Sequence, residues 1–212
     1  GVHALGQVAS LSVTREIDAP ALQRALNAHL PAAVRVVDAQ AADPAFHARF
    51  DATSKTYRYH VWNGEVVPPF LRAFTWHVPS PLLDVRRMDS AARLLEGRHD
   101  FAAFQSLGTD VVSSTRTLLG SRVRRVTIGD LDGVTAGLSA AAGSLLVYEV
   151  SGDGFLRHMV RAIVGTLVDI GRRRHEPHWV LDLMASGDRS QAGETVPALG
   201  LCLVCVRYGS LA

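Results

Sequence analysis

The residues best suited to chemistry lie in one apolar segment, Gly152 to Gly171, which reads GDGFLRHMVRAIVGTLVDIG. After a Gly-Asp-Gly turn, apolar residues recur at three- and four-residue spacing, which predicts a helix. Because apolar side chains also occupy much of the other side, we expect this helix to be buried. Arg157 and Arg161 are four residues apart and so share one face of it. A guanidinium keeps its proton, so a buried arginine requires a carboxylate, a phosphate or carbonyl groups as partners.

Two interpretations of Arg161 satisfy this requirement. In the first, Arg161 pairs with a structural carboxylate elsewhere in the core. In the second, Arg161 holds a reactive carboxylate, while Arg157 and His158 face an anionic ligand at the mouth of the helix. The spacing of these residues is compatible with both.

A second candidate for chemistry is a strand predicted over residues 53–63, followed by an Asn-Gly turn. Basic and aromatic residues interleaved along a strand suit base stacking and phosphate contacts to nucleic acid. The alternative is an amphipathic strand at the edge of a sheet, with solvated arginines. One face of the strand bears two tyrosines and a lysine: Thr53, Lys55, Tyr57, Tyr59 and Val61.

The only two cysteines, Cys202 and Cys205, form a C-L-V-C motif that invites a metal or redox interpretation. They lie in a predicted strand, where residues three apart point to opposite faces. A pair that faces opposite ways can neither form a disulfide nor chelate one ion. We therefore expect both cysteines to pack as small apolar residues in a reducing cytoplasm.

The composition is that of a folded domain, with 48% hydrophobic and 20% charged residues in 212. A net charge of +2 is too small to identify a partner, but nearly all positive charge is arginine, with Lys55 the only lysine. Arginine suits phosphate contacts, although a GC-rich genome produces the same bias. Basic residues interrupt the longest apolar helix, so we expect neither a membrane span nor a signal peptide.

Several further elements are predicted around these candidates. Asp18 caps a helix that stops at Leu30, and a strand follows over residues 34–39. Further helices are predicted over 85–95 and 179–186, and strands over 121–128, 144–151 and 198–208, with a Gly- and Ala-rich loop at 129–143. Strands outnumber crossover helices, which favours an α+β fold: a mixed, mainly antiparallel sheet with helices packed on one face.

Seven stretches, taken together, resemble the tRNA pseudouridine synthase A family. They occur in the family's order and cover almost the whole chain: GVHA at Gly1, FHARF at Phe46, KTYRY at Lys55, DFAAF at Asp100, TRTL at Thr115, GFLRHMVRAIVG at Gly154 and ALGLCL at Ala198. The resemblance implies the pseudouridine synthase fold, with residues 1–48 as the remainder of an N-terminal RNA-binding and catalytic half and residues 49–212 as the C-terminal α+β half.

The resemblance also implies an activity: isomerisation of uridine to pseudouridine in the anticodon arm of tRNA, at positions 38, 39 and 40, by a cytoplasmic homodimer without cofactor or metal. The family's nucleophilic aspartate sits in the string GRTDAGVHA. The printed sequence starts at the second glycine of that string, so the aspartate is expected two residues before Gly1.

Matching the motifs residue by residue assigns further roles. Arg161 resembles the arginine that pairs with the nucleophile, Tyr57 the active-site tyrosine that stacks on the target uracil, and Leu201 the apolar residue that lines the base pocket. Six further residues match as RNA contacts: His3, Arg49, Arg58, Arg116, Arg157 and His158.

Two other function classes remain to be weighed against this one. A chain without the aspartate would be a catalytically inactive tRNA-binding fragment. A hydrolase built from the remaining histidines and aspartates is the third, but the sequence contains neither a G-x-S-x-G nor an H-E-x-x-H motif.

Overall fold

The computed structural model describes residues 1–106, 108, 112–126 and 143–209. They divide into two compact units, one formed by Gly1–Gln7 with Ala52–Ala212 and the other by Val8–Asp51. The functional halves expected at 1–48 and 49–212 remain a prediction. The predicted Gly- and Ala-rich loop at 129–143 lies, except for Gly143, outside the described residues.

The smaller unit contains one helix, α1 (Ala19–His29), which begins and ends as its sequence predicts. The Asp18 side chain accepts a hydrogen bond from the Ala21 amide at 3.2 Å, and the helix ends at Leu30. The strand predicted over 34–39 is wrong. The Asn27 side chain instead bonds both backbone groups of Val36, each at 2.8 Å, so no neighbouring strand satisfies them.

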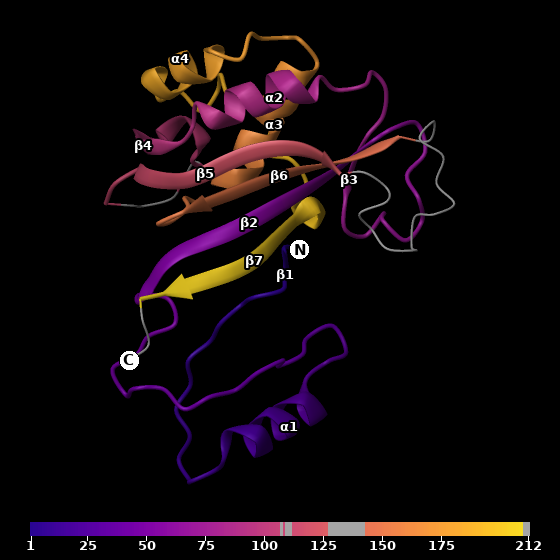
Figure 1. Ribbon diagram of the computed structural model, residues 1–212. Helices are drawn as coiled ribbons and strands as arrows, with labels where there is room; N and C mark the ends of the chain where they lie inside the picture. Colours follow the sequence, from indigo (N-terminus) through magenta and orange to yellow (C-terminus); the bar gives the residue numbers. More distant parts are fainter. Residues whose placement is uncertain (107, 109–111, 127–142, 210–212) are drawn as a thin grey trace. The chain divides into compact units, whose positions relative to one another are not determined.

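The larger unit is built on a seven-stranded sheet with the order β1-β7-β2-β6-β5-β4, in which β3 pairs with β2 (Figure 1). The pairs β1–β7 and β2–β3 are parallel and the others antiparallel, so the predicted mixed, mainly antiparallel sheet is confirmed. Because β2 lies between β7 and β6, its interpretation as an edge strand is wrong. The strands are β1 (His3–Ala4), β2 (Ala52–Asn63), β3 (Trp76–Val78), β4 (Gly97–Asp100), β5 (Thr115–Val126), β6 (Ser144–Gly152) and β7 (Leu201–Tyr208).

Three helices cover one face of this sheet, as Figure 1 shows: α2 (Val85–Arg93), α3 (Met159–Gly171) and α4 (Trp179–Ser186). The predicted buried helix is confirmed over α3, but it starts later than its apolar pattern indicates. His158, just before it, has a left-handed backbone with φ of 61°. Arg157 therefore precedes the helix, and the prediction that it shares a helical face with Arg161 is wrong.

Alternation along the central strands separates two apolar clusters. Tyr59, Val61 and Tyr148 point to the helix-covered face and pack into the main core with α3. Trp62 and Val147 belong to a smaller cluster beneath the segment after β2. Each central strand thus presents its chemical candidates to one face or the other. Within the described residues, no helix has the length and apolar content needed to cross a bilayer.

Candidate active site

Tyr57 lies in the middle of the sheet, on the helix-covered face. Its backbone pairs with Val150 of β6 and Leu203 of β7, beside a register shift in the β2–β7 ladder. Its ring meets Phe155 edge-on, with centroids 5.2 Å apart and planes at 82°. Burial raises the pKa of the Tyr57 hydroxyl. The phenol therefore keeps its proton at neutral pH and can donate a hydrogen bond.

Arg161 lies in the first turn of α3 and is partly buried. Its Nε donates to the Val196 carbonyl oxygen at 2.5 Å, a group at the end of the loop before β7. In the described ranges, no carboxylate lies within ion-pair distance of this guanidinium. One donor is therefore satisfied by a backbone carbonyl, while the Nη groups remain for another acceptor.

The Tyr59 side chain bonds to the same loop as Arg161. Its ring is fully buried, and its hydroxyl donates to the Pro197 carbonyl oxygen at 2.7 Å. Burial raises the pKa of Tyr59; the charge of Arg161 opposes this shift and that of Glu194 adds to it. The carbonyl groups of two successive residues, Val196 and Pro197, therefore accept hydrogen bonds from Arg161 and Tyr59. The two side chains are close enough for the charge of Arg161 to affect the pKa of Tyr59.

Leu201 is the first residue of β7 and pairs with Tyr59, whereas Tyr57 pairs with Leu203. Leu201 therefore lies on the same face of the sheet as Tyr57 and close to it. It is 7% exposed. A Cβ on Gly200 would lie 2.7 Å from the Tyr59 ring, so only glycine lets the chain approach that ring. The structure thus brings Tyr57, Leu201 and Arg161 to one side of the sheet.

Arg157 and His158 directly precede α3. The His158 Nδ1 and the Ser106 hydroxyl are 2.7 Å apart, and the Ser106 amide donates to the Arg157 carbonyl at 3.3 Å. Burial, followed by the charges of Arg161 and Arg157, lowers the pKa of His158. Neutral His158 is therefore the favoured form near pH 7, while Arg157 is exposed and charged.

Arg116 approaches the same region from β5. Its Nη1 donates to the carbonyl groups of Ser113 and Thr115, at 2.8 and 2.6 Å. A Cβ on Gly154 would lie 3.4 Å from the Arg116 side chain, which places that side chain against the turn before α3. Arg116, Arg157 and His158 thus all border the segment that leads into α3.

The remaining predicted contacts lie elsewhere. Arg58 is on the opposite face of β2, where its Nε pairs with Glu149 at 2.5 Å. His3 lies on that face too: its Nε2 is 3.1 Å from the Ala73 carbonyl and its ring is 4.8 Å from that of Phe74. Arg49 belongs to the smaller unit, where its guanidinium lies 5.5 Å from the centroid of the Phe50 ring. The structure therefore does not bring Arg58 or His3 to Tyr57.

The two cysteines do not point to opposite faces of β7, as regular alternation predicted. Cys202 pairs with Arg58 and Cys205 with Thr56, which share one face of β2, because the register shifts between Thr56 and Tyr57. Both are free thiols; Cys202 is buried and Cys205 partly exposed. Burial raises the pKa of the Cys202 thiol, which makes it a poor nucleophile. The described part of the chain contains no cluster of three histidine, cysteine or acidic side chains placed to hold a metal ion.

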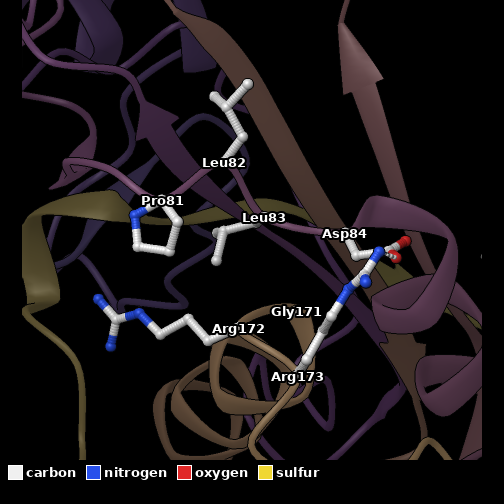
Figure 2. A pocket seen from close by; sticks show the side chains of 7 residues that line it. All are labelled: Pro81, Leu82, Leu83, Asp84, Gly171, Arg172 and Arg173. Atoms are coloured by element: carbon white, nitrogen blue, oxygen red, sulfur yellow. Dashed lines mark hydrogen bonds and ion pairs between the residues drawn. The ribbon is translucent and has the colours of Figure 1, made fainter.

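A surface hollow of about 370 Å³ lies at the other end of α3 (Figure 2). Arg173 closes one side of it through an ion pair with Asp84 at 3.2 Å. Gly171 is ten residues from Arg161, about 15 Å along the helix, so this hollow is separate from the tyrosine and arginine described above. It is lined by Pro81, Leu82, Leu83, Asp84, Gly171, Arg172 and Arg173.

The sequence patterns gave no functional role to the loop of residues 187–197. This loop contributes backbone carbonyl groups to the site, and a backbone carbonyl cannot be recognised from the type of residue that carries it. The one available hint was Gly193, a residue typical of places where two backbones approach closely.

The chain is similar to known proteins of one family. A family model described as tRNA pseudouridine synthase matches residues 91–209. The protein named tRNA pseudouridine synthase A from Pelobacter propionicus is 41% identical over 208 residues, which cover 98% of this chain and 78% of that protein. Its namesake from Moorella thermoacetica is 40% identical with the same coverage, and that from Solibacter usitatus is 42% identical over 209 residues, again 98% of this chain and 78% of the relative. The chain therefore belongs to the tRNA pseudouridine synthase A family.

Proposed function

We propose that this chain forms the catalytic and RNA-binding part of an enzyme that isomerises uridine to pseudouridine in the anticodon arm of tRNA, at positions 38, 39 and 40. The observation that supports this most directly is Arg161, which reaches the Tyr57 and Leu201 face of the sheet and whose Nη groups have no acceptor among the described residues. The finer assignments, namely the three tRNA positions, a homodimer and a cytoplasmic location, belong to the same proposal.

The chemistry explains why these residue types are needed. The N1–C1′ bond of uridine breaks, the uracil turns, a C5–C1′ bond forms, the C5 proton leaves and N1 gains a proton. The base must be flipped from its stack and held against an apolar or aromatic surface. Tyr57 and Leu201 supply that surface, because stacking keeps its strength while the ring turns. The protonated Tyr57 phenol is suited to donate a hydrogen bond to the base.

The reaction also needs a carboxylate, which either attacks C1′ or removes the C2′ proton. Arg161 would keep it ionised, because an adjacent cation lowers the pKa of a carboxyl group. We place this carboxylate two residues before Gly1. A Cβ on Gly1 would lie 3.0 Å from the Ala198 Cβ, and two residues span at most about 7 Å. An aspartate two residues before Gly1 would therefore lie within about 7 Å of Gly1, beside the segment that carries the Val196 and Pro197 carbonyls.

The residues that border α3 are the proposed tRNA contacts nearest to this site. Arg157 is exposed, Arg116 is half-buried, and both are permanently charged and suited to phosphate. Arg58 and His3 are proposed as contacts to other parts of the tRNA, since they lie on the opposite face of the sheet from Tyr57. Arg49, in the smaller unit, is proposed as a further tRNA contact.

The activity is tested by release of tritium from C5-labelled uridine in tRNA, with protein expressed from the coding sequence extended upstream of Gly1. Arg161→Ala and Tyr57→Phe should each abolish or cripple release while tRNA binding persists. Arg93→Lys is the control, because Arg93 is an exposed helix residue that pairs with Asp89. Wild-type release rates in both site variants would refute the site.

Comparing the 212-residue chain with the extended protein distinguishes the enzyme from the alternative, a catalytically inactive tRNA-binding fragment. We expect no release from the printed 212 residues and release from the extended protein, whose upstream codons should encode Arg-Thr-Asp. Absence of release from both, with tRNA still bound, would leave the binding alternative. Substrates with uridine at one of the three positions, and sedimentation of the extended protein, test the site preference and the dimer.

A further inference from the structure

The loop of residues 187–197 crosses α3 where two backbones meet without side chains between them. A Cβ on Gly165 would lie 2.1 Å from the Glu194 carbonyl oxygen, and one on Gly193 would lie 2.3 Å from the Thr166 amide nitrogen. Real Cβ atoms essentially never come within 3.0 Å of such atoms. Glycine at both positions therefore sets how closely, and at which residue, the loop crosses the helix.

Hydrogen bonds hold the loop at this crossing. The Gly193 amide donates to the Thr166 hydroxyl oxygen at 2.9 Å, and that hydroxyl donates to the Ala162 carbonyl at 3.1 Å. All of these groups lie in the first two turns of α3 or directly against them. The loop is thus fixed to the same turns that bear Arg161.

Arg189 holds the loop from its other side. Its Nη1 donates to the carbonyl oxygens of Ala192 and Gly193, at 3.4 and 3.0 Å, and its Nη2 donates to the Thr195 hydroxyl at 2.8 Å. The acceptors of these three bonds lie on both sides of the crossing at Gly193, and the last of them, Thr195, directly precedes Val196. A guanidinium is suited to this task because its donors form a rigid planar fork, which an ammonium group does not provide.

The carbonyl that follows this clamp is the one that orients Arg161. Val196 is three residues beyond Gly193, is fully buried, and accepts the Arg161 Nε–H at 2.5 Å. Because Nε donates to this carbonyl, a carboxylate would bind Arg161 through its two Nη groups. A shift of the Val196 carbonyl would release Nε and turn the guanidinium.

We propose that Arg189 is a positioning residue for Arg161: it holds the loop across α3 so that the Val196 carbonyl directs the Arg161 Nη groups at the reacting carboxylate. This inference rests on the proposed function for the identity of that carboxylate. The clamp itself is a property of the folded chain.

The test uses Arg189→Lys in the extended protein, with Arg93→Lys as an exposed arginine control. We expect kcat to fall about 10- to 100-fold, because small misplacements of a catalytic group have effects of that size. KM for tRNA should stay within about twofold of wild type, since the inferred role of Arg189 is to hold the loop and not to bind RNA. In an Arg161→Lys background the same change should cost less than about threefold, because residues that act as a unit are not additive.

A second readout does not depend on activity. The Nε–H of Arg161, identified in proton–nitrogen NMR spectra by its loss in Arg161→Lys, should exchange with solvent at least about tenfold faster in Arg189→Lys, because its acceptor is displaced. Where Arg189→Lys does not fold, Thr195→Val, which removes only one acceptor of Arg189, is measured by the same criteria. Its effects should have the same direction and be smaller.

Three results would overturn the inference: an unchanged kcat with raised KM, losses that multiply in the double variant, or unchanged exchange of the Arg161 Nε–H. The failure of the proposed function is a different result. If Arg161→Lys retained wild-type release, the site assignment would be wrong, whereas the exchange measurement would still decide whether Arg189 holds the Arg161 side chain.

Discussion

Replacing Gly165 by alanine sets two physical effects against each other. Gly165 is buried in the middle of α3, where alanine is the better helix former by about 1 kcal/mol. The added Cβ would, however, lie 2.1 Å from the Glu194 carbonyl oxygen. That oxygen belongs to backbone, so it cannot turn away as the end of a flexible side chain can. We therefore expect Gly165→Ala to destabilise the protein despite its gain in helix propensity.

The magnitude follows from the displacement. To reach even a 3.0 Å contact, the crossing must open by about 0.9 Å. Overpacking of this kind costs about 1–3 kcal/mol, and loss of the Gly193–Thr166 hydrogen bond adds about 1 kcal/mol. After the propensity gain, the free energy of unfolding should fall by about 1–3 kcal/mol. For a chain of this size the corresponding drop in Tm is about 3–9 °C.

The measurement is urea and thermal unfolding of both Gly165→Ala and a matched glycine variant, Gly120→Ala. Gly120 lies in β5 with no atom within 4 Å of an added Cβ, so its substitution should change stability by less than about 0.5 kcal/mol. A Tm for Gly165→Ala that equals or exceeds that of wild type would refute the backbone crossing and the argument built on it.

Further predictions follow from single contacts. Tyr59→Phe should lower the free energy of unfolding by about 1 kcal/mol because the Pro197 carbonyl loses its donor, whereas Tyr57→Phe should leave stability nearly unchanged; equal costs in urea titrations would contradict this. Burial lowers the pKa of His60 in the folded state; a hydrogen bond with the Gly200 backbone opposes this shift, and the charges of Arg58, Arg124 and His3 add to it. The unfolded chain therefore takes up the proton first, and stability falls as pH drops below about 6.5. His60→Gln should flatten this dependence between about pH 7 and about pH 5, and an unchanged slope would show that His60 is not responsible. Affinity for tRNA should fall linearly with salt on logarithmic axes, and Arg116→Ala should reduce that slope by about one if Arg116 contacts a phosphate.

Local signals in the sequence were sufficient for most elements of the larger unit. The apolar pattern of α4 predicts its bounds, and the alternation from Thr53 to Asn63 predicts β2 to within one residue. The pattern failed where a nearby side chain took over the backbone bonds, as Asn27 does for Val36. It also failed at the start of α3. The apolar pattern extends back to Phe155, but the left-handed backbone at His158 makes the helix begin only at Met159.

The sequence by itself determined the family, through seven motifs in order, and the residue types its chemistry requires: a permanent cation at Arg161, an aromatic ring at Tyr57 and an apolar side chain at Leu201. The tertiary structure alone decided that β2 is a central strand, that Arg58 and His3 face away from Tyr57, and that Arg161 is oriented by the Val196 carbonyl. The reason is that motifs reside in side chains along one stretch of chain. The orientation of Arg161 depends on a backbone carbonyl 35 residues away, whose position is set by the crossing of the loop over α3.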